Sequence, residues 1–285
     1  MNIVLYPNFR KKNALPTALK VCDKLKSLDI EIAADEKYRA EFKDKPFVSF
    51  GGVDDIVSKC DIIIAIGGDG TILKASHYAS EHNKPLLGIN TGHLGFMASM
   101  EIDELENLSR LKTSDYKIET RMMLDISQVR DNTLISRYTA LNDIVIARPY
   151  SKISDFEVST DNIVVSSIRS DGVVFSTPTG STAYALSAGG PIVEPYLECI
   201  QLTPICPHSL SSRTMLFSPE RKIEVRHFSN EKAEVYFSVD GRPEVQVERD
   251  DVLVVSRSLK KLRLIDIKGN SFFDAVNNKL MNPIK

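Results

Sequence analysis

Short hydrophobic runs and helically spaced apolar residues alternate along the first third of the chain. The runs Ile3–Tyr6, Asp61–Ile66 and Leu86–Ile89 are continuous, which predicts buried strands. Between the first two runs, apolar residues recur at helical spacing at Leu15, Leu19, Cys22 and Leu25, and a second helical pattern follows Gly67-Gly68. Strand, helix and strand in succession predict a parallel sheet with right-handed crossovers, and hence an α/β domain over residues 1–117.

The pattern changes after about Lys117, where short alternating runs follow one another closely. Turn-forming pairs such as Asp161-Asn162 and Asp240-Gly241 separate them. The runs are Met123–Val129, Asn142–Ala147, Phe156–Val165, Gly172–Ser176, Lys222–Arg226, Ala233–Val239 and Val252–Ser256. This close succession of short strands and turns predicts a β-rich, sandwich-like second domain over residues 118–260.

The last segment, residues 261–285, differs from both domains. Ser271 has the position of a helix cap with Asp274 three residues on, and Phe273, Val276 and Leu280 repeat at helical spacing. We expect a short C-terminal helix that docks back onto the body, although the pattern does not indicate which domain receives it.

Composition narrows the function classes. The 285 residues suggest about two domains, and 36 Lys and Arg against 38 Asp and Glu give a net charge of −2. That balance argues against a broad basic face for nucleic acid or membranes. The longest aliphatic run, Ile62–Ile66, is far shorter than the ~20 residues of a membrane span.

The four cysteines lack regular spacing and the five histidines form no metal motif. We expect a cytoplasmic protein with reduced thiols and no protein-bound metal cluster.

The first candidate for chemistry is Gly67-Gly68-Asp69-Gly70-Thr71, between a predicted strand and a predicted helix. Ligands of open α/β sheets bind beyond the carboxyl ends of strands, and glycines let backbone N–H groups approach negative oxygens. The Asp69 carboxylate is unexpected beside phosphate unless it accepts a proton or holds a hydroxyl. The alternative, about equally favoured, is a tight turn in which Asp69 caps the helix. Lys74, one turn into the helix, could reach a ligand phosphate, although a solvated lysine is the more common case.

The second candidate is the run of hydroxyl and small residues from Thr177 to Gly190. Its hydroxyls could bind phosphate or ribose oxygens, and Tyr184 offers a face for stacking a base. A Ser/Thr-capped helix is the alternative, which explains one or two of these residues but not the whole run. For Arg169–Gly172 alone, a turn built on Asp171-Gly172 is favoured. The pair Asn142-Asp143 suits sugar hydroxyls or an amino-purine edge, although a plain turn would also use it.

With these motifs in order, the chain resembles the NAD kinase family, in its bacterial type. The resemblance rests on Gly67–Thr71, on Asn90–Phe96, on Asn142-Asp143 and on Thr177–Gly190, and Ser271–Leu280 resembles the family's C-terminal helix. The first loop alone is weakly specific, since lipid kinases of the diacylglycerol type and phosphofructokinases carry similar loops. The two long segments together are highly specific.

The resemblance implies transfer of the terminal phosphoryl group of ATP to the 2′-hydroxyl of the adenosine ribose of NAD, which gives NADP and ADP. It implies magnesium that arrives with ATP, a homodimer or homotetramer, and a site between the two domains. The donor range, the preference for NAD or NADH and the oligomer size stay open.

Residue by residue, the resemblance implies that Asp69 accepts the proton of the 2′-hydroxyl. The positions implied to contact NAD are Asp69, Gly70, Lys74, Asn142, Asp143, Lys152, Arg169, Asp171, Thr182, Ala183, Tyr184, Ala185, Leu186, Ser187 and Arg242. Arg242 departs from the family, since many bacterial relatives have Gln there, and Lys152 falls at a variable position. A lipid kinase and a non-catalytic NAD(H) sensor remain as alternatives; the sensor would have no need for a carboxylate at position 69.

Overall fold

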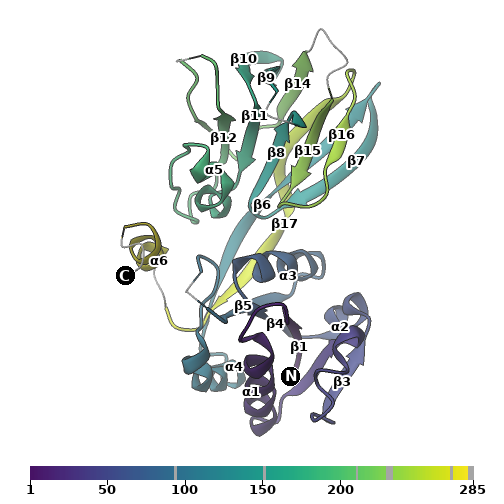
Figure 1. Ribbon diagram of the computed structural model, residues 1–285, viewed down its shortest axis with the longest axis vertical. Helices are drawn as coiled ribbons and strands as arrows, with labels where there is room; N and C mark the ends of the chain where they lie inside the picture. The colour runs from purple at the N-terminus through teal and green to yellow at the C-terminus, as the bar shows by residue number, and fades with distance from the viewer. Residues whose placement is uncertain (93–94, 150–151, 210, 229–233, 270–271, 282–285) are drawn as a thin grey trace. The chain divides into compact units, whose positions relative to one another are not determined.

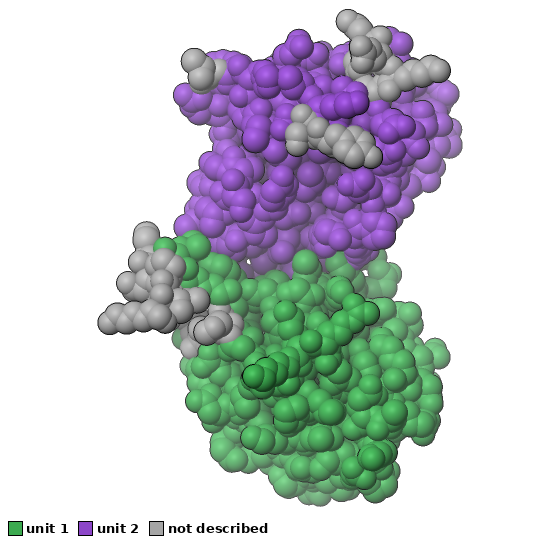
Figure 2. Space-filling view, viewed as in Figure 1, with its two compact units in different colours: residues 1–120, 260–285 green, residues 121–259 purple. Residues whose placement is uncertain are grey.

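The computed structural model describes residues 1–92, 95–149, 152–209, 211–228, 234–269 and 272–281. The chain forms two compact units, residues 1–120 together with 260–285 and residues 121–259 (Figure 2). Strand β17 (Val252–Asp266) carries the chain from the second unit back into the first.

The first unit is built on a parallel sheet (Figure 1), so the predicted α/β domain with a parallel sheet is confirmed. Its strand order is β17-β5-β4-β1-β2-β3, with β17 contributing its C-terminal part. The strands are β1 (Asn2–Pro7), β2 (Glu31–Asp35), β3 (Val48–Gly51), β4 (Ile62–Gly67) and β5 (Pro85–Asn90). The helical elements are α1 (Ala14–Ser27), η1 (Glu36–Tyr38), α2 (Val53–Lys59), α3 (Asp69–Glu81), η2 (Ile102–Leu108) and α4 (Ser109–Lys112).

The core of this unit explains the continuous aliphatic run of β4. Every residue of β4 is buried. Alternate residues of the strand, Ile62, Ile64 and Ile66, share one hydrophobic cluster with Val21 and Leu25 of α1. Because a strand buried on both faces needs no polar positions, the sequence there shows a run without alternation.

The second unit consists of antiparallel strands, which confirms the predicted β-rich half. One sheet has the order β13-β12-β11-β8-β15-β16, and a second set pairs β10-β9-β14 with the N-terminal part of β17, and β6 with β7. A single cluster joins Phe156 and Val225 of one set to Phe175 and Phe237 of the other, as in a sandwich core. The strands are β6 (Lys117–Arg130), β7 (Thr133–Ala140), β8 (Asp143–Ala147), β9 (Ser154–Thr160), β10 (Ile163–Ser170), β11 (Gly172–Ser176), β12 (Ile200–Ile205), β13 (Met215–Phe217), β14 (Ile223–Phe228), β15 (Val235–Val239) and β16 (Val245–Val247).

Three strand predictions differ from the structure. Met123–Val129 is only part of β6, which begins at Lys117. The run Phe156–Val165 is not one strand, because Asp161 and Asn162 adopt positive φ (52° and 62°) and turn the chain between β9 and β10. Val252–Ser256 is only the beginning of β17, which continues to Asp266. The sequence hides that continuation because Leu259 is 96% exposed and two lysines follow it, which breaks the apolar pattern.

The tail belongs to the first unit. It contains α6 (Phe272–Val276) and a π-helical turn, η5 (Asn277–Met281), which confirms a C-terminal helix. The predicted cap Ser271 lies outside the described residues. Within the described part of the chain, no helix has the length and apolar character needed to cross a membrane.

Candidate active site

The loop between β4 and α3 holds Asp69 in an unusual way. Gly68 is the extended N-cap residue of α3, and Asp69 is the first residue inside the helix. The Asp69 carboxylate turns toward the segment that follows β5, where Oδ2 accepts a hydrogen bond from the Phe96 N–H (3.0 Å) and Oδ1 accepts one from the Met97 N–H (3.3 Å). The capping alternative for Asp69 is therefore wrong, and the side chain, 29% exposed, is fixed by backbone outside its own helix.

Gly95 allows this arrangement by bringing its backbone against the carboxylate. A Cβ atom at position 95 would lie 1.8 Å from Asp69 Oδ1 and 2.5 Å from its Cγ. No side chain fits in that space. The sequence contained a signal for this contact, the glycine segment Asn90–Phe96, but not the identity of its partner.

A third donor reaches Asp69 from the C-terminal tail. Lys279 Nζ lies 3.3 Å from Asp69 Oδ2 and 4.7 Å from the centroid of the Phe96 ring. The two residues are 210 positions apart, so no pattern in the sequence indicates this contact.

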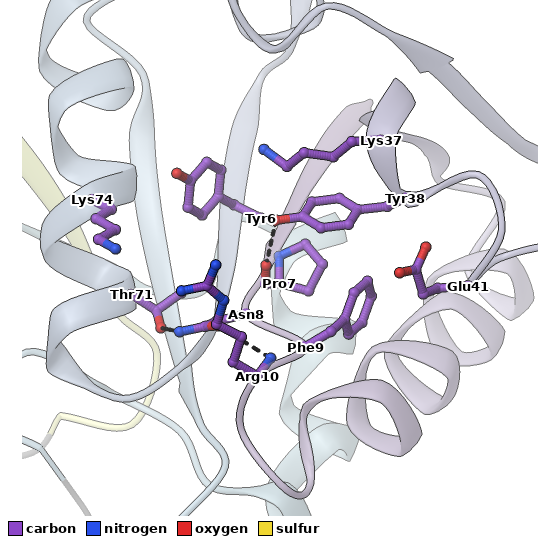
Figure 3. A pocket seen from close by; sticks show the side chains of 10 residues that line it. All are labelled: Tyr6, Pro7, Asn8, Phe9, Arg10, Lys37, Tyr38, Glu41, Thr71 and Lys74. Atoms are coloured by element: carbon purple, nitrogen blue, oxygen red, sulfur yellow. Dashed lines mark hydrogen bonds between the residues drawn. The ribbon is translucent and has the colours of Figure 1, made fainter.

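A cavity of about 710 Å³ opens next to the same loop, at the carboxyl ends of β1 and β2 (Figure 3). Asn8 Nδ2 donates to Thr71 Oγ1 of α3 (3.2 Å), and Tyr38 OH donates to the Pro7 carbonyl (2.9 Å), so the walls are tied together. Three cationic and three aromatic side chains contribute to the lining, which consists of Tyr6, Pro7, Asn8, Phe9, Arg10, Lys37, Tyr38, Glu41, Thr71 and Lys74. Such a lining suits an anionic ligand that also has a flat ring.

In the second unit, Asp240 fixes the predicted pair Asn142-Asp143. Its carboxylate accepts hydrogen bonds from three successive backbone N–H groups, those of Leu141 (2.8 Å), Asn142 (2.8 Å) and Asp143 (3.1 Å). Asp240 itself has positive φ, as has Gly241, so the predicted turn is present. In the sequence, Asp240 was recognisable only as a turn residue, and no pattern indicated this second role.

The start of the Thr177–Gly190 segment packs on the same pair. The Thr177 hydroxyl donates to the Leu141 carbonyl (2.6 Å) and accepts from the Gly180 N–H (3.0 Å). A Cβ at Gly180 would lie 2.0 Å from the Asn142 carbonyl oxygen, so glycine is needed there. Among the described residues, the side-chain oxygen of Asn142 is buried without a hydrogen-bond partner, which leaves an acceptor for a ligand N–H.

The remaining predicted residues lie mostly in this second unit. Thr182 ends the short helical turn η4 (Thr179–Thr182), Ala183 links it to α5 (Tyr184–Ser187), and the Tyr184 side chain is 45% exposed. Arg242 is exposed two residues beyond Asp240. On β10, a guanidinium nitrogen of Arg169 lies 3.9 Å from a carboxylate oxygen of Asp155. The Asp171 backbone carbonyl accepts a hydrogen bond from the Arg148 N–H. Lys152 is exposed before β9, and among the described residues no hydrogen bond joins it to the Asn142 cluster. Asp69, Gly70 and Lys74 belong to the first unit.

Burial perturbs the Asp143 carboxyl. Removal from water, followed by the negative charge of Asp240, raises its pKa from 3.8 to about 7, against the lowering effect of a backbone hydrogen bond at Tyr184. The carboxyl therefore holds its proton in the folded protein at pH values where the unfolded chain has released it.

This shift predicts a pH-dependent effect of Asp143→Asn. Well below pH 3.8 the carboxyl is protonated in both states, whereas between 3.8 and about 7 mainly the unfolded chain ionises, so the free energy of unfolding falls as pH rises. Asn carries no proton to lose and keeps an acceptor oxygen. Denaturant titrations should find the variant more stable than wild type by up to about 4 kcal/mol at pH 8 and nearly equal to it at pH 4. A stability difference of the same size at both pH values would contradict a protonated Asp143.

The chain matches two known domain families. The ATP-NAD kinase N-terminal domain matches residues 3–115, and the ATP-NAD kinase C-terminal domain matches residues 141–267. Among curated proteins, the NAD kinase of Symbiobacterium thermophilum is 42% identical over 222 residues, which cover 77% of this chain and 78% of that protein. The two halves thus match the two domains of one class of kinase. The chain belongs to the NAD kinase family, and the predicted resemblance is confirmed.

Two solved structures are similar over nearly the whole chain. Yeast NADH kinase complexed with NADH has a TM-score of 0.88 at 26% identity, covering 99% of this chain and 88% of the yeast chain. An NAD kinase from Archaeoglobus fulgidus in complex with ATP has a TM-score of 0.71 at 28% identity, covering 98% of each chain. The fold of this chain is therefore that of NAD kinases.

Proposed function

We propose that this protein transfers the terminal phosphoryl group of ATP to the 2′-hydroxyl of the adenosine ribose of NAD, giving NADP and ADP. The observation that carries the proposal is the carboxylate of Asp69, held at the start of α3 by the Phe96 and Met97 N–H groups within the family's loop. Phosphoryl transfer depends mainly on positioning and charge stabilisation. A positioned carboxylate orients the hydroxyl and accepts its proton late, which typically contributes ~10²–10⁴-fold.

The donor fits the cavity of the first unit. Its cations Arg10, Lys37 and Lys74 suit the phosphates, and the rings of Tyr6 and Tyr38 suit a nucleotide base (Figure 3). The start of α3 adds backbone N–H groups that favour negative charge. The A. fulgidus relative, whose structure contains ATP, supports a nucleoside triphosphate as donor.

We assign the dinucleotide to the residues that the family resemblance implies. Asn142 offers its unpartnered oxygen to an N–H of the ligand, and the exposed face of Tyr184 is free to stack on a ring. The yeast relative, whose structure contains NADH, supports a dinucleotide ligand. The proposed contacts are Asp69, Gly70, Lys74, Asn142, Asp143, Lys152, Arg169, Asp171, Thr182, Ala183, Tyr184, Ala185, Leu186, Ser187 and Arg242.

Magnesium is proposed to arrive with ATP. This ion keeps several waters and is commonly held by one or two carboxylates together with substrate phosphates. Asp69 already accepts three hydrogen bonds, which fits a cation coordinated mainly by ATP. When bound, the ion would neutralise charge on the phosphates.

The proposal also covers the cellular location of the protein and its oligomeric state. The thiols of Cys22, Cys60, Cys199 and Cys206 are all free, which fits a cytoplasmic location. Self-association to a homodimer or homotetramer follows from the family resemblance, and sedimentation of the purified protein would measure it.

Two alternatives make different predictions. A lipid kinase does not account for two halves that both match ATP-NAD kinase domains. A non-catalytic NAD(H) sensor would bind the dinucleotide without forming a product, and it gives no reason for the fixed carboxylate of Asp69.

The chemical position of the new phosphate tests the proposal. We expect the product from NAD, ATP and magnesium to carry its phosphate on the 2′-oxygen of the adenosine ribose, located by ³¹P and ¹H NMR. Initial rates with ATP, GTP and polyphosphate, each with NAD and NADH, define the donor and acceptor. Phosphate at another hydroxyl, or turnover confined to a lipid alcohol, would overturn the proposal.

Arg10→Ala should raise the KM for ATP several-fold and leave the KM for NAD unchanged.

A further inference from the structure

Asp69 presents an electrostatic problem for the proposed reaction. Its carboxylate lies at the start of α3, the helix that also contributes Thr71 and Lys74 to the cavity whose cations suit phosphates. A negative side chain repels a polyanionic donor unless another group compensates its charge. The compensating charge in this structure is Lys279, whose Nζ lies 3.3 Å from Asp69 Oδ2.

Lys279 also contacts the Phe96 ring, and the segment that carries Phe96 is itself held in place. Its ammonium group lies 4.7 Å from the centroid of the Phe96 ring, a cation–π distance, while the Phe96 N–H donates to the same oxygen, Asp69 Oδ2. The segment that carries Phe96 is anchored to the sheet, because the Asn90 N–H donates to the Met100 carbonyl (2.8 Å) and the Ser99 hydroxyl donates to the Ile265 carbonyl (2.6 Å). Lys279 and Asp69 are only 32% and 29% exposed, so water screens the pair less than a surface ion pair.

The three donors leave the two oxygens of the Asp69 carboxylate with different numbers of open acceptor positions. An ionised carboxylate has about four acceptor positions, two on each oxygen. Phe96 and Lys279 occupy those of Oδ2, and Met97 occupies one of Oδ1. One position therefore stays open, and it belongs to Oδ1.

We infer that Lys279 is a positioning residue, which saturates Asp69 Oδ2, turns Oδ1 toward the acceptor hydroxyl and offsets the charge of the carboxylate. The inference rests on the proposed kinase function. In the step it supports, the hydroxyl oxygen forms a bond to the γ-phosphorus and its proton passes to Asp69 Oδ1. The bond from the γ-phosphorus to the β–γ bridging oxygen breaks, and ADP leaves with that electron pair.

Lys279→Met tests this role, because methionine keeps the length of the side chain without its charge. The kcat for NADP formation should fall about tenfold to hundredfold, while the KM values for ATP and NAD change less than about threefold. Lys279→Arg, which restores a cation, should recover most of the lost kcat. A lysine with only a structural role would lower thermal stability without this split between kcat and KM.

Lys268→Met is the matched control. Lys268 lies in the same C-terminal segment of the first unit and pairs with Glu104, with exposures of 28% and 24% that resemble those of the Lys279–Asp69 pair. The control should keep the wild-type kcat, and its thermal midpoint should match that of Lys279→Met. The double variant Asp69→Asn with Lys279→Met should be no slower than Asp69→Asn alone, since Lys279 acts through Asp69.

The outcomes separate this inference from the proposed function. If wild type forms NADP and Lys279→Met is as active as Lys268→Met, the positioning role is wrong and the kinase function stands. A faster Lys279→Met variant, or additive losses in the double variant, would likewise overturn the positioning role. If wild type forms no NADP, the proposed function fails, and the inference fails with it.

Discussion

Asp69→Asn should lower the kcat for NADP formation by ~10²–10⁴-fold while the affinity for NAD stays within a few-fold of wild type. Oδ2 receives two donors, the Phe96 N–H and the Lys279 ammonium, so the single carbonyl oxygen of an asparagine is most stable in that position. The amide NH₂ group then takes the place of Oδ1. It cannot accept the hydroxyl proton and loses the hydrogen bond from the Met97 N–H, although its size is nearly that of the carboxylate. Single-turnover rates together with equilibrium binding of NAD measure both quantities.

Asp44→Asn is the control for this loss. Asp44 is exposed in the same unit, so the same chemical change there should leave kcat unchanged. A wild-type kcat in Asp69→Asn would show that Asp69 does not accept the proton. Binding of NAD by wild type without any product would favour the sensor alternative instead.

Gly95→Ala should disable the same carboxylate without removing it. The new Cβ would lie 1.8 Å from Oδ1, the oxygen with the open acceptor position, so either Asp69 rotates or the backbone at residues 95–97 shifts. In both cases the hydrogen bonds from the Phe96 and Met97 N–H groups lengthen and the carboxylate loses its orientation. We expect kcat to fall about 100-fold, because a displacement of about 1 Å at a reacting group can cost that much.

Gly92→Ala provides the comparison, since a Cβ at Gly92 meets no atom within 4 Å. Both variants lose the same glycine freedom in the unfolded chain, so their difference isolates the contact with Asp69. Equal kcat values for the two alanine variants would contradict the role assigned to Gly95. Combined with Asp69→Asn, Gly95→Ala should have little further effect on kcat.

The sequence predicted those parts of the fold whose signals are local. Ile62–Ile66 is a strand because it is buried on both faces, and its continuous aliphatic run made that visible. The pattern did not predict β2 and β3, which are short and contain alanine or glycine where longer strands have branched side chains. The extension of β17 beyond Ser256 was hidden because Leu259 is exposed and lysines follow it.

The site shows the same division. Asp69 and the Thr177–Gly190 segment could be found because each belongs to a contiguous motif. Arg10, in the loop after β1, lines the same cavity as Thr71 and Lys74 of α3, and Lys279, in the tail, pairs with Asp69. Both arrangements arise only through folding, so no spacing in the sequence connects these residues. Asp240 was visible as a turn residue, but its three hydrogen bonds to residues 141–143 depend on the pairing of β15 with β8.

The stoichiometry of the reaction tests the central claim most directly. Purified protein is supplied with ATP, magnesium and NAD, and ADP and NADP are measured in the same samples, NADP with a dehydrogenase specific for it. We expect one NADP for each ADP formed and no ADP above background when NAD is left out. Formation of ADP without NADP, or the absence of both products, would contradict the assignment of this protein as a kinase of NAD.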